Sequence, residues 1–282
     1  MQAGVDFFKV NCFVADLLAM DAAFRSKWES YSQEIRSWNL FALREVEAGH
    51  KRLAFRRGKL HRRHRVHFEW LKSHFSEVEE QDFRMAPEPR EWIRFARDDQ
   101  RKAETLKRWE LRLRQFVESA GAPGFWVADC NLKPQPSVES KIRAYLDGTA
   151  DLDLWDVVRS RICALGPGEL LACIRSLQNE FEGRILRVRN YFVRPRRTPE
   201  NSLYTAIHFE LRDEYDTFME IQFMTARRNA ICLIDHSLVR KSMVAFRSWQ
   251  EEIWLQEMSL TANILDAEQL ERELSRTPAS VA

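Results

Sequence analysis

The stretch DTFMEIQFMTARRNAICLIDHSL, residues 216–238, decides the class of the fold. Read with a period of two, its first half predicts a β-strand with Met219, Ile221 and Phe223 on one face. Glu220 and Gln222 then fall on the other face, in the middle of an otherwise apolar strand. A carboxylate and an amide in that position indicate a chemical role for one face of a sheet.

The residues before this strand alternate between strand and helix patterns. Residues 157–165 are β-branched and apolar, which predicts a strand, and 167–181 carry a helical stripe of apolar residues behind a proline. Three further strands are predicted within 183–193, 203–212 and 215–225, the last two joined by a tight antiparallel turn at YDTF. We expect a long helix over about 225–257 and a frayed end after it.

The first part of the chain has the residue pattern of helices and not of strands. Residues 12–120 are almost without glycine, and their apolar residues recur at spacings of three and four, as in Trp28, Tyr31, Ile35 and Trp38. The sequence therefore predicts an α+β protein. A helical N-terminal region over 1–122 precedes a mixed β-sheet flanked by helices over 123–260, and a C-terminal tail covers 261–282.

Composition narrows the functional class. Hydrophobic residues make up 45% of the 282, enough for a core, yet no apolar run is long enough for a membrane span or a secretory signal, so we expect a cytoplasmic protein. The five cysteines are widely spaced without a CxxC pair, which favours buried free thiols over a disulfide or a metal site.

Acidic residues occur at two strands where burial should exclude them. Asp156 comes directly before the strand at 157–165, and Glu220 lies inside the last strand. Two such carboxylates could converge on a divalent cation such as magnesium, whose other ligands are usually water and substrate phosphates. In the alternative interpretation Asp156 caps a turn and Glu220 pairs with an arginine.

Basic residues gather around the same predicted sheet, and Arg187 and Arg189 share a strand face on which they could clasp a polyphosphate. A solvated strand face is the alternative. The sequence has no Walker A and no GxGxxG pattern, so side chains would have to bind a nucleotide. The basic residues are Lys133, Lys141, Arg143, Arg161, Arg184, Arg187, Arg189, Arg194, Arg196 and Arg197.

Six segments of residues 131–241 occur in the order of motifs known from one family. LKPQPSVESKI is similar to R-x-K-S-x-x-S, DVVRSRI to D-x-x-G-x-R and RNYFVRP to K-D-Y-x-x-x-P. NSLYTAIH is similar to N-G-Y-x-S-L-H, EIQFMT to E-x-Q-I-R-T and IDHSLVRK to E-H-x-x-x-Y-K. In this order the segments resemble the synthetase domain of the RelA/SpoT family, the alarmone synthetases.

The resemblance implies transfer of pyrophosphate from ATP to a ribose 3′-hydroxyl. It implies that Asp156 and Glu220 are the catalytic pair and hold Mg²⁺, and that Glu220 orients or deprotonates the attacking hydroxyl. It also implies a set of nucleotide-binding residues, in which Arg161 stacks on adenine, Tyr204 stacks on the acceptor base and basic groups neutralise phosphate. This set is Lys133, Lys141, Arg161, Arg187, Arg189, Tyr204, His208 and Gln222, with His236 on the neighbouring helix.

The segments depart from the family pattern mainly around the acceptor. Asn131 stands in place of an arginine, Asn190 in place of an aspartate and Met224 in place of an arginine. Leu203, Thr205 and Ala206 replace the residues around Tyr204. A guanine nucleotide is the expected acceptor, as in alarmone synthesis, and the 3′ end of tRNA is the alternative known from toxic family members. A catalytically dead module that binds RNA or a partner protein is the third possibility.

The segment KRLAFRRGKLHRRHR, residues 51–65, bears on that choice. It holds eight Lys or Arg and no acid, although the whole chain has a formal charge of only +2. On a helix these residues form a face that could bind RNA phosphates through Arg52, Arg56, Lys59, Arg62 and Arg63. The alternative is a solvated helix docked on the acidic remainder. His61, His64 and His67 lack the acidic or thiol partners of a metal site. A homo-oligomer and an antitoxin remain possible partners.

Overall fold

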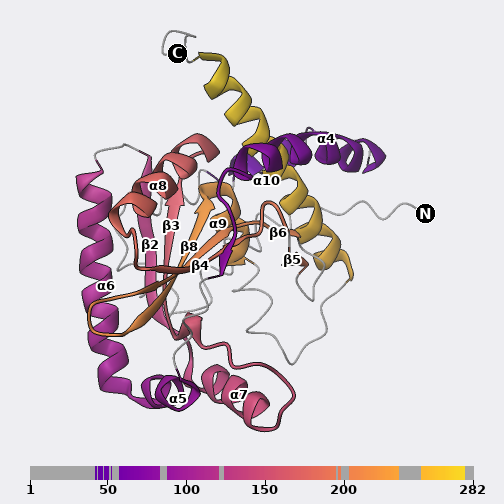
Figure 1. Cartoon of the computed structure of the whole chain (residues 1–282). Helices are drawn as coiled ribbons and strands as arrows, with labels where there is room; N and C mark the ends of the chain where they lie inside the picture. Colours follow the sequence, from indigo (N-terminus) through magenta and orange to yellow (C-terminus); the bar gives the residue numbers. More distant parts are fainter. Residues whose placement is uncertain are drawn as a thin grey trace.

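The computed structural model describes residue 42 and residues 44–46, 48–50, 52, 57–82, 88–120, 124–194, 196–197, 203–234 and 249–276. The predictions for Trp28 to Trp38, Cys12, Arg56 and His236 lie outside the described residues. Within them, the structure is a mixed sheet flanked by helices (Figure 1), which confirms the predicted α+β class. None of the described helices combines the length and the apolar composition that a membrane crossing needs.

The main sheet has six strands in the described part of the chain, in the order β1-β4-β7-β8-β3-β2. Only the central neighbours β3 and β8 run parallel, and the other pairs are antiparallel. The strands are β1 (Gln81–Asp82), β2 (Phe125–Leu132), β3 (Val158–Ala164), β4 (Ile185–Asn190), β7 (Ile207–Arg212) and β8 (Phe218–Thr225). A separate two-stranded ribbon pairs β5 (Arg196–Arg197) with β6 (Leu203–Tyr204).

The turn between β7 and β8 confirms the predicted antiparallel connection. Asp216 adopts φ 61°, a left-handed conformation that aspartate tolerates better than most residues. The Asp213 carboxylate accepts hydrogen bonds from the backbone N–H groups of Tyr215 and Thr217, which fixes the turn. The register that follows pairs His208 with Gln222 across the two strands.

Strand β2 was not predicted. Its sequence FWVADCNL begins with four apolar residues in a row, and polar residues alternate with others only from Asp129 on, so the strand lacks a clean alternation. The register of β2 against β3 also shifts between Val127 and Asp129, which breaks the period of two. Beyond β2 the chain forms α7 (Gln135–Leu146) and a single 3₁₀ turn, η1 (Trp155–Val157), directly before β3.

Helices α5 (Pro89–Arg97), α6 (Asp99–Ser119) and α8 (Pro167–Glu180) share one hydrophobic core with the sheet. Trp109 and Phe116 of α6 contact Phe181, which follows α8, and Phe209 packs edge-on against Phe223 within the sheet. Helices α5 and α6 therefore share the core of the sheet instead of forming one of their own. Burial of these aromatic side chains contributes about 2–3 kcal/mol each before conformational entropy is counted.

The C-terminal part differs from the prediction. The helix expected over 225–257 begins as α9 (Ala226–Ile234), and a separate helix, α10, spans Trp249–Arg276. The predicted tail is therefore wrong for residues 261–276, because Ile264 and Leu270 of α10 are buried. The sequence favoured an exposed end because 271–276 are mostly polar, but apolar residues continue at helical spacing through Leu270.

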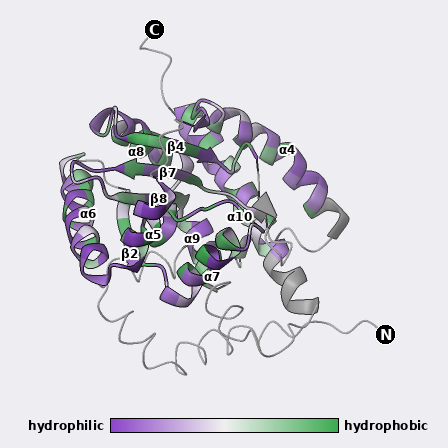
Figure 2. Cartoon of the chain, turned by 60° about the horizontal axis from the view of Figure 1, so that its bottom comes forward, coloured by the Kyte–Doolittle hydropathy of each residue, from purple (hydrophilic) through white to green (hydrophobic). Residues whose placement is uncertain are grey.

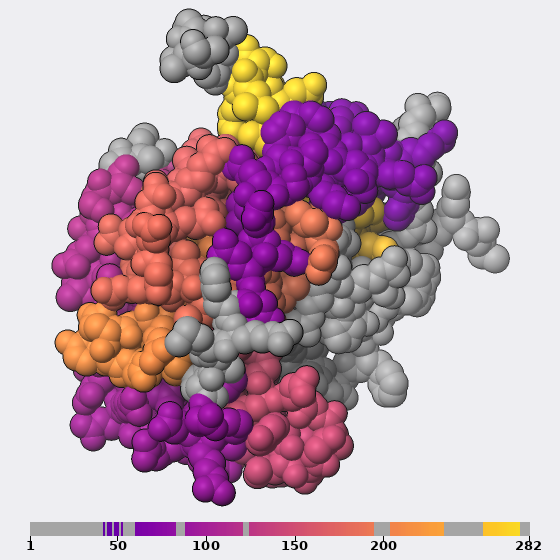
Figure 3. Space-filling view, viewed as in Figure 1, coloured from indigo at the N-terminus to yellow at the C-terminus, as the bar shows by residue number. Residues whose placement is uncertain are grey.

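Helix α4 (Arg57–Phe75) lies across α10 (Figure 1), where Leu60 packs against Leu260 and Ile264. Colouring by hydropathy shows that α4 is largely hydrophilic, whereas the strands carry more of the hydrophobic residues (Figure 2). The two helices form a continuous part of the surface in the space-filling view, with α4 in purple beside the yellow end of α10 (Figure 3).

Candidate active site

One face of the sheet is lined by polar side chains across five strands. The pairing register aligns Arg187, Glu210, Glu220, Arg159 and Asn131 in one row. A second row aligns Arg189, His208, Gln222, Arg161 and Asp129. Register partners point to the same side of a sheet. The opposite face is apolar and belongs to the main core, so the period-two pattern of β8 correctly separated the polar face of the strand from its apolar face.

Glu220 lies near the centre of this polar face and is only 4% exposed. Its carboxylate contacts His208 Nδ1 at 3.1 Å and accepts a hydrogen bond of 2.7 Å from Gln222 Nε2. Burial alone would raise the pKa of Glu220, but the charge of His208 and the hydrogen bonds from His208 and Gln222 outweigh it and hold the pKa far below its usual range. The side chain is therefore an ionised carboxylate at neutral pH.

Tyr204 extends this arrangement by one step. Its hydroxyl lies 2.8 Å from His208 Nε2, so the imidazole is held at both nitrogens, by Tyr204 and by Glu220. The Tyr191 ring packs edge-on against His208 as well. Burial raises the pKa of Tyr204, which keeps its phenol protonated. His208 is only 7% exposed, so its imidazole is buried among Glu220, Tyr204 and Tyr191.

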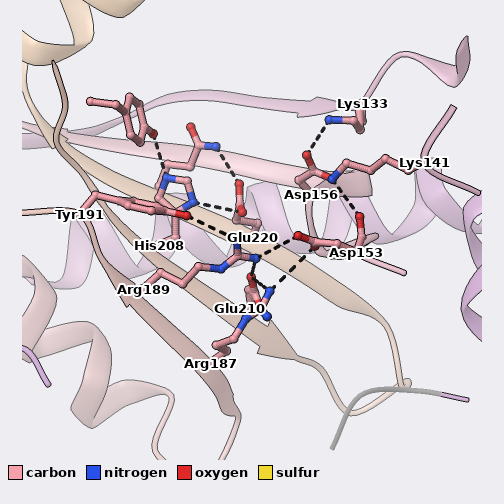
Figure 4. A network of polar contacts seen from close by, with 12 residues as sticks. Lys133, Lys141, Asp153, Asp156, Arg187, Arg189, Tyr191, His208, Glu210 and Glu220 are labelled. Atoms are coloured by element: carbon pink, nitrogen blue, oxygen red, sulfur yellow. Dashed lines mark hydrogen bonds and ion pairs between the residues drawn. The ribbon is translucent and has the colours of Figure 1, made fainter. Parts of the chain in front are cut away.

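Arg187 and Arg189 lie on the same face, as predicted, and both contact Glu210 (Figure 4). Glu210 is fully buried, and burial raises its pKa above the ordinary value although both guanidinium groups oppose the shift. Asp153 faces the same two arginines at 3.9 and 3.6 Å. In this structure the predicted phosphate-binding arginines are therefore paired with carboxylates. A phosphate that binds to these arginines must displace the carboxylates.

Asp156 lies in η1 and is held between two ammonium groups. Lys133 Nζ donates a hydrogen bond of 2.6 Å to one carboxylate oxygen, and Lys141 Nζ donates one of 3.0 Å to the other. The Lys133 backbone N–H also bonds to Val157, which fixes the end of β2 against η1. The structure thus brings together Asp156, Lys133 and Lys141, three of the residues that the motifs singled out.

The clusters of Asp156 and Glu220 belong to one network (Figure 4). Lys141 donates to the backbone oxygen of Asp153, whose carboxylate faces Arg189. Arg189 Nη1 lies 3.4 Å from the Tyr191 hydroxyl, and the Tyr191 ring contacts His208. Contacts therefore run without a break from Asp156 to Glu220.

Arg161 lies beside Gln222 on the same polar face, but its polar contacts lead to other residues. It is 9% exposed, donates a hydrogen bond of 2.9 Å to Asn229 and lies 3.8 Å from Asp129. Its guanidinium is thus held inside the protein, and its role in adenine stacking stays a prediction.

Two of the departures from the family pattern have a structural reason. The buried Asn190 donates to the carbonyl oxygens of Phe75 and Val78 and accepts from the N–H groups of Phe192 and Val193. An ionised aspartate could not donate the first two bonds, so asparagine fits this position. Asn131 accepts a hydrogen bond from Arg159, the register neighbour of Glu220.

Residues 57–65 of the basic segment lie in α4, and described side chains of the segment contact α10, as in the docked-helix interpretation. Arg52 and Arg63 both contact Glu268 of α10, with 62% and 48% of their side chains exposed. Arg62 and Arg65 are exposed, and the side chains of Arg56 and Lys59 lie outside the described residues. His64 is stacked on Phe68 and contacts Asn263, so it packs against its surroundings.

The protein side chains at the site could supply only some of the ligands of a magnesium ion. Among the described side chains, no group of three or more His, Cys, Asp or Glu is arranged to hold a metal. Asp156 and Glu220 supply hard carboxylate oxygens, and magnesium usually takes one or two of these together with water and substrate phosphates. The donor set therefore fits a metal that arrives with a nucleotide.

Sequence reasoning missed Glu210, Asp153 and Tyr191. Glu210 had a detectable signal, because His208 and Glu210 alternate with Ile207, Phe209 and Leu211 in the same way as Gln222 and Glu220 in the next strand. Tyr191 also had a signal, because it stands at the tyrosine of the K-D-Y pattern in RNYFVRP. Asp153 carried none, since it lies in the loop before η1.

The cysteines follow the prediction of burial. Cys163, Cys173 and Cys232 are buried and Cys130 is partly buried, all as free thiols. Burial raises the pKa of Cys130 to about 12, so its thiol is protonated at neutral pH.

No family model and no curated protein matches this chain. Solved structures do resemble it. A GTP pyrophosphokinase family protein from Streptococcus pneumoniae is 19% identical with a TM-score of 0.47, over 62% of this chain and 90% of that protein. Small alarmone synthetase 1 from Bacillus subtilis bound to pppGpp is 19% identical with a TM-score of 0.46, over 66% and 98%. Small alarmone synthetase 2 from the same organism is 18% identical with a TM-score of 0.44, over 65% and 95%.

Proposed function

We propose that this chain is a magnesium-dependent ATP pyrophosphokinase that transfers pyrophosphate to the 3′-hydroxyl of a guanine nucleotide, a reaction of alarmone synthesis. The observation that carries the proposal is the ionised, buried Glu220, joined by continuous contacts to Asp156 and its two lysines. The ordered motifs of residues 131–241 supply the identity of the reaction.

The reaction balances as a single displacement. The 3′-oxygen of the acceptor attacks the β-phosphorus of ATP, and the bond between that phosphorus and the oxygen bridging to the α-phosphate breaks. AMP leaves with the bridging oxygen, and the acceptor gains the β- and γ-phosphoryl groups. The proton of the 3′-hydroxyl is lost to a base or to solvent. Such transfers depend mainly on positioning and charge stabilisation.

Asp156 and Glu220 would hold the magnesium ion. When bound, the ion neutralises charge on the phosphates and polarises the phosphoryl oxygens. Binding of the ion would replace the present contacts of Asp156 with Lys133 and Lys141. The two ammonium groups would then be released toward the triphosphate, where point charges of this kind are effective.

Glu220 would also orient the acceptor hydroxyl. Its low pKa makes it a weak base, which suits a loose transition state that needs little proton removal before bond cleavage. His208 holds one carboxylate oxygen and Gln222 the other, so the direction of the carboxylate is fixed before substrate arrives. Tyr204 stacks on the acceptor base in this proposal, with a ring that is half-buried in the structure.

The test is incubation of the full chain with magnesium and ATP labelled at the γ-phosphate, together with GDP, GTP or bulk tRNA. The proposal expects label in a guanosine tetra- or pentaphosphate and release of one AMP for each product molecule. Label only in inorganic phosphate, or release of ADP in place of AMP, would contradict it. Label in none of the acceptors would favour a catalytically dead module.

The 3′ end of tRNA is the second candidate acceptor, because the outer side of α4 remains basic although the helix is docked on α10. Arg62 and Arg65 are exposed there. If tRNA is the acceptor, label appears in the RNA band, and the double change Arg62→Gln and Arg65→Gln raises KM for tRNA with little effect on kcat. The matched control changes the exposed Arg90 and Lys107 on α5 and α6 to Gln. Equal effects of the two pairs would contradict a role for α4.

A further inference from the structure

Arg228 of α9 is a buried cation that the proposed reaction does not use. Arg228 is only 2% exposed. Nη1 donates a hydrogen bond of 3.0 Å to Ser259 Oγ of α10, and Nε has no hydrogen-bond partner. Among the described residues no carboxylate forms an ion pair with it. Burial of a guanidinium usually costs free energy that its contacts must offset.

The guanidinium faces the ring of Tyr204. Its carbon Cζ lies 5.4 Å from the ring centroid, within the range of a cation–π contact. Tyr204 in turn holds His208, and His208 holds Glu220. Four contacts therefore connect α10 to the candidate catalytic carboxylate, through Ser259, Arg228, Tyr204 and His208.

We propose that Arg228 is a positioning residue for the pyrophosphoryl transfer, an inference that rests on the proposed function. The cation fixes the plane of the Tyr204 ring, the phenol then fixes the orientation of His208, and His208 fixes the carboxylate of Glu220. Ser259 anchors the cation. Helix α10 lies beyond residues 131–241, which carry the family motifs, so this chain of contacts makes the C-terminal helix part of the catalytic unit.

The neighbouring Arg227 offers a matched comparison. Its Nη1 donates a hydrogen bond of 2.7 Å to Gln269 of α10, which resembles the bond from Arg228 to Ser259. Arg227, however, is paired with Asp266 and Glu45. Ser259→Ala and Gln269→Ala therefore each remove one hydrogen bond between α9 and α10, and only the first touches the arginine that faces Tyr204.

The kinetic test compares these variants of the full chain. Arg228→Gln is expected to lower kcat about tenfold while KM for ATP stays unchanged, and Arg228→Lys to recover part of the loss because an ammonium group is also attracted to the ring. Ser259→Ala should lower kcat about threefold and Gln269→Ala should leave it unchanged. In a Tyr204→Phe background, which keeps the ring but removes the hydroxyl, Arg228→Gln should add less than about a twofold loss.

A second readout does not need activity. The imidazole nitrogen signals of His208 in ¹⁵N-histidine NMR spectra, assigned with His208→Gln, should shift in Arg228→Gln and stay in place in Gln269→Ala. If the wild type is active and Arg228→Gln leaves kcat unchanged, the inference is overturned. It is also overturned if the His208 signal does not shift in Arg228→Gln. A folded wild type without transfer to any acceptor overturns the proposed function instead, and the His208 signal then decides whether Arg228 positions the histidine.

Discussion

Glu210 and Glu220 lie directly opposite each other on β7 and β8, both buried, and their surroundings shift their pKa values in opposite directions. Two like charges in this arrangement would destabilise the sheet unless each had its own partners. Glu210 has Arg187 and Arg189, and Glu220 has His208 and Gln222. Glu210 thus holds the two arginines, whereas Glu220 is an ionised carboxylate held by His208 and Gln222.

The competition between carboxylate and phosphate for the arginines can be measured. Asp153 is 44% exposed and faces both Arg187 and Arg189, so Asp153→Asn should lower KM for ATP by about threefold as one competitor loses its charge. Arg189→Gln should raise KM for ATP by about tenfold, since the proposed site then loses one of its two phosphate-binding guanidinium groups. Initial rates over a range of ATP concentrations provide both values. A fall in KM for Arg189→Gln would contradict this assignment.

Asn190 is expected to be required for folding and not for chemistry. Asn190→Asp removes two buried donors and places a carboxylate against the carbonyl oxygens of Phe75 and Val78, so the free energy of unfolding should fall by about 3 kcal/mol. Urea denaturation followed by circular dichroism measures the change. The matched variant Asn131→Asp, at a partly buried residue that accepts from Arg159, should change stability by less than about 1 kcal/mol. Equal losses in the two variants would refute the account.

The packing of α4 on α10 is expected to weaken in mild acid. Burial, with the nearby charges of His61 and His67, lowers the pKa of His64 to about 4 from 6.5. Between pH 4 and pH 6.5, His64 binds a proton in the unfolded chain but not in the folded chain. Stability is therefore fully present above pH 6.5 and falls as the pH drops toward 4, by up to about 3 kcal/mol. Urea unfolding at pH 7.5 and pH 5 should show the drop, and His64→Gln should remove most of it.

The thiols are expected to react slowly in the folded protein. Because burial raises the pKa of Cys130 to about 12, almost no thiolate is present at pH 8. Iodoacetamide followed by mass spectrometry should label Cys130, Cys163, Cys173 and Cys232 only after unfolding. Rapid labelling of Cys130 in the native protein would contradict the burial described above.

The sequence predicted those parts of the fold that local patterns specify. Strands β3, β4, β7 and β8 and helix α8 follow from alternation and helical spacing, and the polar face follows from Glu220 and Gln222. Strand β2 and the bounds of helix α10 were not predicted. A register shift interrupts the period of two in β2, and the last residues of α10 are mostly polar.

In the candidate site, too, residues within sequence motifs were predicted, whereas partners brought in by tertiary packing were not. Motif order indicated Asp156, Lys133 and Lys141, which the fold brings together. Partners that depend on tertiary packing escaped detection. Arg228 meets Tyr204 only after α9 folds back along the sheet, and Asp153 meets Arg187 and Arg189 from a loop before β3.

The single-turnover rate of pyrophosphoryl transfer in Glu220→Gln shows whether the buried carboxylate takes part in the reaction. This change keeps the shape of the side chain and removes its charge, and the exposed Glu182→Gln is the matched control. We expect a loss of about a thousandfold or more for Glu220→Gln and an unchanged rate for the control, with circular dichroism showing both variants folded. Transfer by folded Glu220→Gln at the wild-type rate would contradict this expectation.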